Sequence, residues 1–236
     1  MKKTAIVLAL TSVFATNVMA EGLSGGVELD AKFVNGGEKA YSTSNGSGIK
    51  AFIGYEGFGV SAKRKANFEN EYNFNYKHDF NGFWLKGEYE FVDKKSVQNQ
   101  PNKPVNDQNK FGVTVGGNVA DLFDSSLRLR KDTDLNSDHG VERSDIYRFD
   151  LAAGKQVTER MYFNAKVVGQ KENNKDAITV ANGPVDKSKD TIYNVELRAT
   201  FTDIQNMVPY VEVGNEGAFG TDTRNTYGKV GVIFPF

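Results

Sequence analysis

The sequence predicts an all-β protein: a transmembrane antiparallel up-and-down β-barrel of about 12 strands that follows a cleaved signal peptide. Three observations support this fold class. Segments of about ten residues alternate between apolar and polar side chains, and the connections between them alternate between short and long. The final segment, Tyr227–Phe236, shows the same alternation and ends on a phenylalanine. Successive side chains of a strand point to opposite faces, and about ten residues is the length that a tilted strand needs to cross a bilayer.

Residues 1–20 are expected to be a removable signal peptide, and residues 21–236 the barrel. Lys2 and Lys3 form a charged start, an apolar run follows, and Val18-Met19-Ala20 has the small residues of a cleavage site. Removal of the two lysines leaves 27 basic and 30 acidic residues, a net charge of −3.

Composition excludes several function classes. The chain has no cysteine, so neither a disulfide framework nor a thiolate metal site is available. No Walker-type loop and no nucleic-acid-binding signature occurs, so we expect no cofactor and no nucleic-acid partner. The mean hydropathy of −0.48 excludes a helical membrane protein but not a barrel, whose lumen-facing half is polar.

Alternation defines each predicted strand. In Phe83–Phe91, for example, Leu85 and Tyr89 lie on one face and Lys86 and Glu88 on the other. The twelve predicted strands are Leu23–Val34, Ile49–Glu56, Phe58–Phe68, Tyr72–Phe80, Phe83–Phe91, Phe111–Val119, Ser126–Lys131, Asp145–Lys155, Met161–Gln170, Thr191–Phe201, Pro209–Asn215 and Arg224–Phe236.

The connections predict the orientation of the barrel. The short ones are Gly57, Asn81-Gly82, Ala120–Ser125, Val157–Arg160 and Thr202–Val208, and Asn81-Gly82 is a strong hairpin signal. The long, polar ones are Asn35–Gly48, Asp93–Asn109, Asp132–Ser144, Lys171–Asp190 and Glu216–Thr223, with Asn70-Glu71 the one exception to the alternation. This is the outer-membrane topology, with long loops outside and both termini in the periplasm.

Aromatic residues cluster at strand ends on the apolar face, as Phe33, Tyr55 and Phe58 illustrate. This placement is typical of the two interfacial girdles of a membrane barrel. A soluble sandwich, the competing fold, would place its largest side chains at strand centres.

Charges on the polar face predict an anion pathway. The basic residues of this face are Lys32, Lys50, Lys63, Lys65, Lys77, Lys86, Lys110, Arg128, Arg130, Arg148, Lys166, Arg198 and Lys229. The acidic ones are Glu28, Asp30, Glu56, Asp79, Glu88, Glu90, Asp150, Glu196 and Glu212, which leaves an excess of +4 in the lumen. Tracks of Arg and Lys select anions. The alternative is that these residues only neutralise one another across the lumen.

The C-terminal third resembles a known family. Pro209–Asn215, Thr221, Arg224 and Tyr227–Phe236 are similar to the end of the oligogalacturonate-specific porins, small twelve-stranded channels whose relatives include a sialic-acid channel. Leu127-Arg128-Leu129-Arg130 resembles a Leu-Arg-x-Arg strand of that family, and Asn194-Val195 its antepenultimate strand. The resemblance implies a lumen lined by facing basic tracks, although many of the corresponding positions here are lysines rather than arginines.

Two weaker signals point elsewhere. The run Asp132–Gly140 has the alternating oxygen ligands of a calcium loop, but Ser137 and Arg143 replace the required Gly and Glu. A solvated loop is therefore expected there. The two histidines, His78 and His139, raise the alternative of a barrel enzyme of the lipase or protease kind, which needs a base beside a nucleophile.

Taken together, the sequence predicts a monomeric outer-membrane channel of a Gram-negative bacterium for passive, anion-preferring uptake of small acidic oligosaccharides. Its expected partners are these sugars, outer-membrane lipid and the barrel-assembly machinery. A barrel enzyme and a non-selective porin are the alternatives. The residues predicted to line the substrate path are Arg128, Arg130, Arg148, Lys166 and Arg198 on one wall and Lys63, Lys65, Lys77 and Lys86 on the facing wall.

Overall fold

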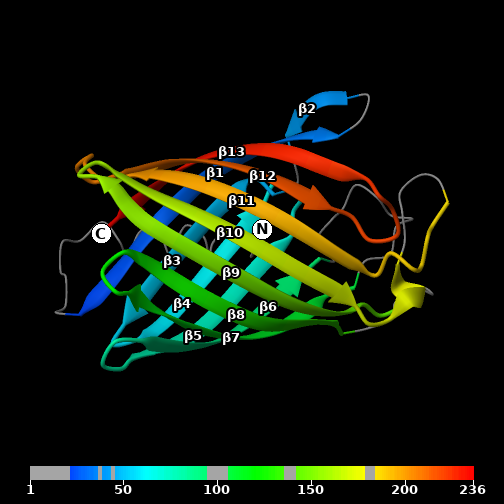
Figure 1. Cartoon of the computed structure of the whole chain (residues 1–236), viewed down its shortest axis with the longest axis horizontal. Coiled ribbons are helices and arrows are strands. Elements are labelled where there is room, and N and C mark those ends of the chain that lie inside the picture. The colour runs from blue at the N-terminus through cyan, green and yellow to red at the C-terminus, as the bar shows by residue number, and fades with distance from the viewer. Residues whose placement is uncertain (1–21, 37–38, 44–45, 95–105, 136–141, 179–183) are drawn as a thin grey trace, which may run out of the picture.

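The protein folds into a closed antiparallel β-barrel (Figure 1). The computed structural model describes residues 22–36, 39–43, 46–94, 106–135, 142–178 and 184–236. The signal peptide expected over residues 1–20 lies outside this range. No helix in the described part of the chain is long and apolar enough to cross a membrane.

Twelve strands form the wall of the barrel, as the alternation predicts. They are β1 (Leu23–Gly36), β3 (Gly48–Tyr55), β4 (Phe58–Lys65), β5 (Asn70–Asp79), β6 (Trp84–Asp93), β7 (Gln108–Val119), β8 (Phe123–Asp134), β9 (Asp145–Thr158), β10 (Met161–Glu172), β11 (Thr191–Phe201), β12 (Val208–Gly217) and β13 (Arg224–Pro235). Each pairs with its neighbour along the chain, and β13 closes the barrel on β1, with Leu29 opposite Val232.

A thirteenth strand was not predicted. The short β2 (Lys39–Thr43) lies in the segment expected to be a loop. It pairs with the C-terminal part of β1, from Phe33 to Gly36, on the same edge of β1 that pairs with β3 from Leu23 to Asp30. It therefore forms a hairpin that projects past the barrel wall (Figure 1). Strand β8 is also longer than predicted, since it begins at Phe123 and runs to Asp134.

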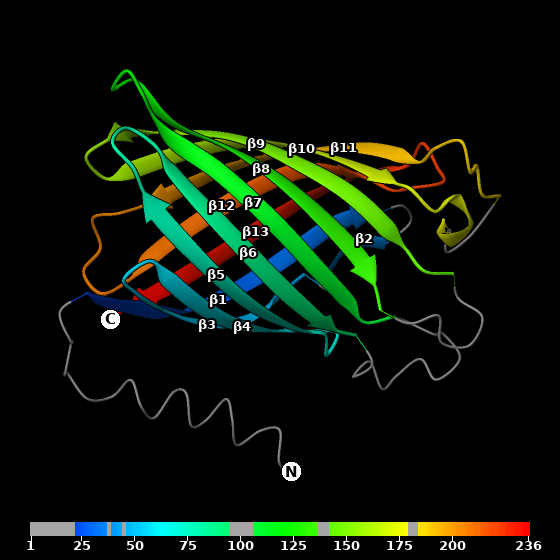
Figure 2. The same cartoon turned by 90° about the horizontal axis from the view of Figure 1, so that it is seen from below.

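Short and long connections lie mostly at opposite ends of the barrel. The connections after β3, β5, β7, β9 and β11 lie at the same end as the C-terminus, and those after β4, β6, β8, β10 and β12 lie at the other (Figures 1 and 2). The connection after β4 is the exception in length: it comprises residues 66–69, fewer than residues 202–207 after β11, and the predicted turn residues Asn70 and Glu71 belong to β5. The Asn81-Gly82 hairpin is confirmed: Phe80 N donates to Phe83 O at 2.7 Å, and Gly82 has a φ of 92°. Any residue with a side chain would be strained at position 82, because only glycine adopts this φ without a steric penalty.

The outer surface of the barrel is apolar. Large hydrophobic side chains of the predicted apolar face are exposed, and Phe58 reaches 64% and Leu129 59%. Soluble monomers rarely expose contiguous apolar surface on this scale. This surface suits lipid rather than water, as for the barrels of outer membranes.

Only a few apolar residues in the described part of the chain are buried: Val92, Val168, Ile178, Tyr210 and Tyr227. The Tyr210 side chain is 2% exposed and lies over Gly231 of the adjacent strand, where a Cβ would come within 2.3 Å of the ring. A glycine on one strand thus admits a ring from the next, an arrangement that stabilises sheets at positions where glycine alone would weaken them. The remaining lumen is polar and charged.

Candidate functional site: a charged lumen

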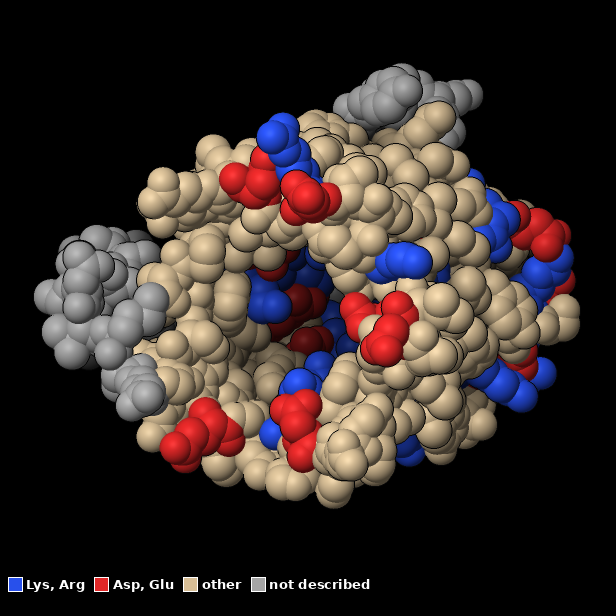
Figure 3. All heavy atoms as spheres, turned by 60° about the vertical axis from the view of Figure 1, so that its left-hand side comes forward, with Lys and Arg blue, Asp and Glu red and all other residues tan. Residues whose placement is uncertain are grey.

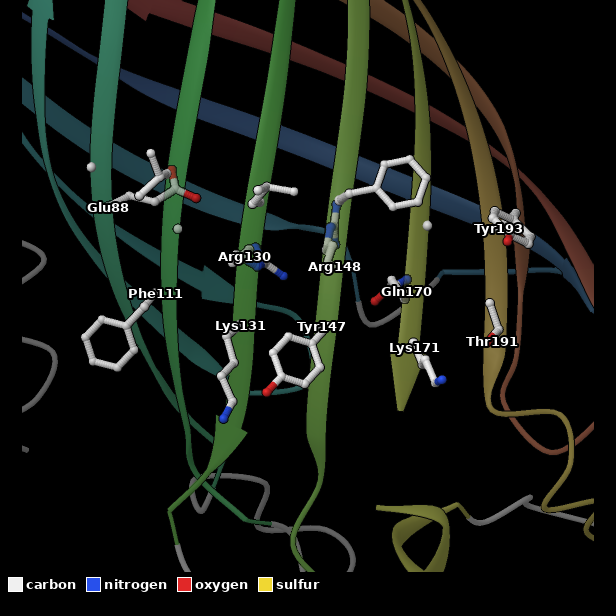
Figure 4. A pocket seen from close by; sticks show the side chains of 16 residues that line it. Glu88, Phe111, Arg130, Lys131, Tyr147, Arg148, Gln170, Lys171, Thr191 and Tyr193 are labelled. Carbon is white, nitrogen blue, oxygen red and sulfur yellow. The ribbon is translucent and has the colours of Figure 1, made fainter. Parts of the chain in front are cut away.

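The nine cations predicted to line the path all lie on the inner face of the barrel. Alternation within β8 places Arg128 and Arg130 inward, because Leu127 and Leu129 are exposed outside. Arg130 and Arg148 are direct cross-strand neighbours, and so are Lys77 and Lys86 (Figure 4 labels the two arginines). The predicted lumen placement therefore follows from the observed strands.

Each of the nine cations also has a carboxylate partner within 4.0 Å. On β4 to β6 the pairs are Lys63–Asp30 (2.7 Å), Lys65–Glu69 and Lys65–Glu71 (both 2.6 Å), Lys77–Asp79 (2.7 Å) and Lys86–Glu88 (3.2 Å). On β8 to β11 they are Arg128–Glu88 (3.0 Å), Arg128–Asp150, Arg130–Asp132 (2.6 Å), Arg148–Asp150 (2.6 Å), Lys166–Glu196 and Arg198–Glu212 (2.5 Å). The sequence did not predict this degree of internal pairing.

Five of these residues form a continuous network across three strands of the wall. Glu88 accepts from Arg128 and lies beside Lys86, while Asp150 accepts from Arg128 and Arg148. Three cations therefore share two carboxylates, and the network retains one positive charge. Fixed charges confined in a narrow passage with low-dielectric walls act more strongly than the same charges in open water.

The network depends on a glycine in the intervening strand. Gly112 of β7 lies between Glu88 and Arg130 in the register, with its missing side chain toward the lumen. A Cβ at Gly112 would lie 2.8 Å from the Glu88 side chain. The space left by this glycine lets the Glu88 carboxylate reach across β7 to Arg128.

The lumen opens as a cavity of about 730 Å³. Seven lysines or arginines line it against five glutamates; the cations are Lys50, Lys63, Lys77, Lys86, Arg128, Arg198 and Lys229. Viewed from the short-turn end, this charged interior is visible through the mouth of the barrel (Figure 3). The structure thus brings together five of the nine predicted residues around one cavity. Lys65, Arg130, Arg148 and Lys166 lie outside its lining.

Two cations of this cavity are not paired. Lys50 on β3 and Lys229 on β13 have no carboxylate within 4.0 Å in the described part of the chain. The Lys50 ammonium lies 5.8 Å from the centroid of the Phe52 ring, and the Lys229 ammonium 5.7 Å from that of Tyr210. Their strands flank β1, so both belong to the same wall. Sequence analysis placed both in the lumen but did not select them as path residues, because only the register shows which cations lack a partner.

At the long-loop end, other charges surround the mouth. Glu69 lies 2.6 Å from Lys65; burial raises its pKa, but the lysine outweighs burial and holds the pKa below the ordinary value of 4.5. Burial lowers the pKa of Lys94 below 10.5, and the attraction of Asp134 and Glu69 only partly opposes this shift. The mouth therefore holds a carboxylate that stays ionised and a lysine whose charge is disfavoured.

The prediction of a solvated loop at Asp132–Gly140 is wrong for Asp132 and Asp134. Asp132 and Asp134 belong to β8 and are buried, and Asp134 accepts hydrogen bonds from Asn106 Nδ2 (3.3 Å) and Ser144 N (3.0 Å). Both carboxylates accept hydrogen bonds inside the barrel, Asp132 from Arg130 and Asp134 from Asn106 and Ser144, and this allows the strand to continue to Asp134. The rest of the run, residues 136–140, lies outside the described residues, as does His139.

His78 lies on the outward face of β5. Its ring packs against Phe80 at a centroid distance of 4.6 Å and near Tyr76 at 6.4 Å. In the described part of the chain the imidazole makes no side-chain hydrogen bond, so no nucleophile or orienting acid adjoins it. Base catalysis needs such a neighbour within hydrogen-bond reach.

Comparisons with known proteins place this architecture. No protein-family model matches the sequence, and no curated protein sequence matches it either. Among solved structures, the NanC porin superposes with a TM-score of 0.64 at 11% identity, covering 88% of this chain and 98% of that one. The KdgM porin gives 0.59 at 16% identity, covering 89% and 99%, and a KdgM porin in complex with disordered oligogalacturonate gives 0.57 at 15%, with the same coverage. The chain therefore shares the barrel fold of the NanC and KdgM porins over nearly their whole length.

Proposed function

We propose that this chain is an outer-membrane channel for the passive, anion-preferring uptake of small acidic oligosaccharides of the oligogalacturonate kind. One observation carries the proposal: the lumen cavity holds more cations than carboxylates, and two of its lysines, Lys50 and Lys229, are free of a carboxylate partner. A uronate carboxylate can pair with an unpartnered ammonium without displacing a protein group. The fold shared with a porin that forms an oligogalacturonate complex supports the choice of substrate class.

The paired cations take a different part in this mechanism. Arg128, Arg148 and Lys86 share two carboxylates, so each keeps donors that a passing anion can use. Arginine's fork suits a carboxylate, while lysine acts as a mobile point charge. Sites of this kind are attractive enough for entry and weak enough for release, which conduction requires.

Planar-bilayer recordings test the proposal. In a salt gradient the reversal potential should report anion preference, and tri-galacturonate should reduce the current in a concentration-dependent way. A Lys50→Ser/Lys229→Ser double variant should lose most of the anion preference and bind the trisaccharide about a hundredfold more weakly, since each of the two sites loses one charge-assisted contact. Arg64→Ser is the matched control, because Arg64 is an outward-facing cation bonded to Asn70.

A non-selective porin is the second candidate, because all nine predicted path cations have carboxylate partners. It predicts a reversal potential near zero in the parent protein and the same block in parent and double variant. Either result would overturn the anion-channel proposal while leaving the barrel assignment intact.

A further inference from the structure

A second cavity lies on the outside of the barrel, away from the lumen. It is a groove of about 820 Å³ that crosses β6 to β11 near their long-loop ends (Figure 4). Its apolar side chains alternate with the inward-facing Arg130 and Arg148, so they face outward; they are Phe111, Val113, Leu129, Tyr147, Phe149 and Tyr193. Six adjacent strands make the groove roughly 24 Å wide.

Two outward-facing glycines shape the floor of this groove. A Cβ at Gly87 would meet no atom within 4 Å, which leaves open space at the β6 end. At Gly169 the ring of Phe149 occupies the place where a side chain would stand, since a Cβ would come within 2.0 Å of it. The floor is therefore recessed at Gly87 and covered by an aromatic ring at Gly169.

Basic residues border the groove at its long-loop end. Lys131 on β8 and Lys171 on β10 are both cross-strand neighbours of Tyr147 on β9 (Figure 4). Lys131 lies 3.1 Å from Asp145 and 5.3 Å from the Tyr147 ring centroid. Lys171 has no carboxylate within 4.0 Å in the described part of the chain, so the rim carries net positive charge.

We propose that this groove binds a bisphosphorylated glycolipid with several acyl chains, in the leaflet that surrounds the long-loop end. The apolar floor matches acyl chains, and the lysine rim matches phosphate groups at the interface. The inference rests on the proposed outer-membrane location but not on the sugar specificity of the lumen.

The spacing of the rim favours two phosphates over one. Lys131 and Lys171 are separated by β9, which puts their backbones roughly 10 Å apart. A headgroup with two separated phosphates supplies one phosphate to each ammonium, whereas a single phosphate has to be shared between the two. A floor that spans six strands also accommodates more chains than a two-chain phospholipid supplies.

Native mass spectrometry of the barrel in detergent tests this, with bisphosphoryl lipid A as the probe. One lipid A should bind per barrel, and monophosphoryl lipid A and phosphatidylglycerol should bind at least tenfold more weakly. Lys131→Ala and Lys171→Ala should each weaken lipid A about tenfold, because each removes one charge-assisted phosphate contact. Gly87→Leu should weaken it similarly by filling the open end of the floor.

Two matched variants control the experiment. Arg64→Ala removes an outward-facing cation that lies off the groove, and Gly228→Leu adds a side chain at an outward-facing glycine of β13 that also has no atom within 4 Å. Both should bind lipid A like the parent protein. Equal binding of phosphatidylglycerol, or equal weakening by the control variants, would overturn the site. All five variants should keep the parent conductance, so loss of lipid binding is distinguishable from failure of the channel proposal.

Discussion

The phenol of Tyr210 on β12 donates a hydrogen bond of 2.6 Å to the Glu28 carboxylate on β1, passing over the intervening strand β13. The two residues are 182 positions apart in the chain. The contact therefore bridges the seam at which the last strand closes the barrel on the first, and the buried ring stands over Gly231 at the same point.

Tyr210→Phe should destabilise the closed barrel. The substitution keeps the ring but leaves the Glu28 carboxylate without its donor, which costs about 1–3 kcal/mol of unfolding free energy. Urea unfolding in lipid vesicles, followed by tryptophan fluorescence, measures the change. Tyr193→Phe is the control, because the exposed Tyr193 hydroxyl makes no hydrogen bond in the described chain. Equal losses in the two variants would show that the seam contact contributes nothing.

Arg128→Ser should lower both stability and anion preference. The Glu88 and Asp150 side chains are only 7% and 6% exposed, and removal of the shared arginine takes one charge-assisted hydrogen bond from each, at a cost of about 3 kcal/mol in total, while Lys86 and Arg148 stay as their partners. Lumen positions tolerate polar change, so the barrel still forms. The same urea titration and the reversal potential in a salt gradient measure the two effects.

A rescue experiment separates charge from packing at this site. Arg128→Lys keeps a cation between Glu88 and Asp150, so it should recover most of the stability and anion preference lost in Arg128→Ser. If Arg128→Lys stays as unstable as Arg128→Ser, Arg128 stabilises the wall through its packing and its forked donors rather than as a counter-ion.

Glu69 should make part of the barrel's stability depend on acid pH. Its pKa is held below the ordinary 4.5, so the folded state binds fewer protons than the unfolded state between the two values. Its contribution is complete above pH 4.5 and disappears as the pH falls through the lowered pKa. Glu69→Gln should therefore flatten the acid side of the stability curve, by about 1 kcal/mol or less at neutral pH.

Unfolding free energies at a series of pH values from 3 to 7 test this assignment. Glu159→Gln, at an exposed residue of the turn after β9, should leave the curve unchanged. A curve for Glu69→Gln that parallels the parent at every pH would rule out this carboxylate as the source.

The proposed orientation places the long loops outside the cell. Lys187, in the connection after β10, is 54% exposed, and Arg160, in the short turn after β9, is 78% exposed, at the opposite end of the barrel. Trypsin added to intact cells should cleave after Lys187 and spare Arg160, whereas permeabilised cells should allow both. Cleavage at Arg160 alone in intact cells would reverse the orientation, and with it the leaflet assigned to the outer groove.

The strands, their inward and outward faces and the tight turns could be predicted from the sequence because each depends on neighbouring residues alone. Alternation has a period of two that each strand carries by itself, so the inward placement of Arg128, Lys63 and the other predicted cations could be inferred one segment at a time. Turn signals such as Asn81-Gly82 are equally local. The strand β2 was missed because its segment is rich in polar and small residues and pairs only with the free end of β1.

Only the tertiary structure decided which charges compensate one another. Lys63 meets Asp30 from 33 positions away, and Arg128 meets Glu88 from 40 positions away across the gap left by Gly112. Such pairs depend on strand register, barrel closure and the reach of long side chains, none of which is encoded within a single segment. For the same reason the sequence could not show that Lys50 and Lys229 lack carboxylate partners, or that six strands form an apolar groove beneath Lys131 and Lys171.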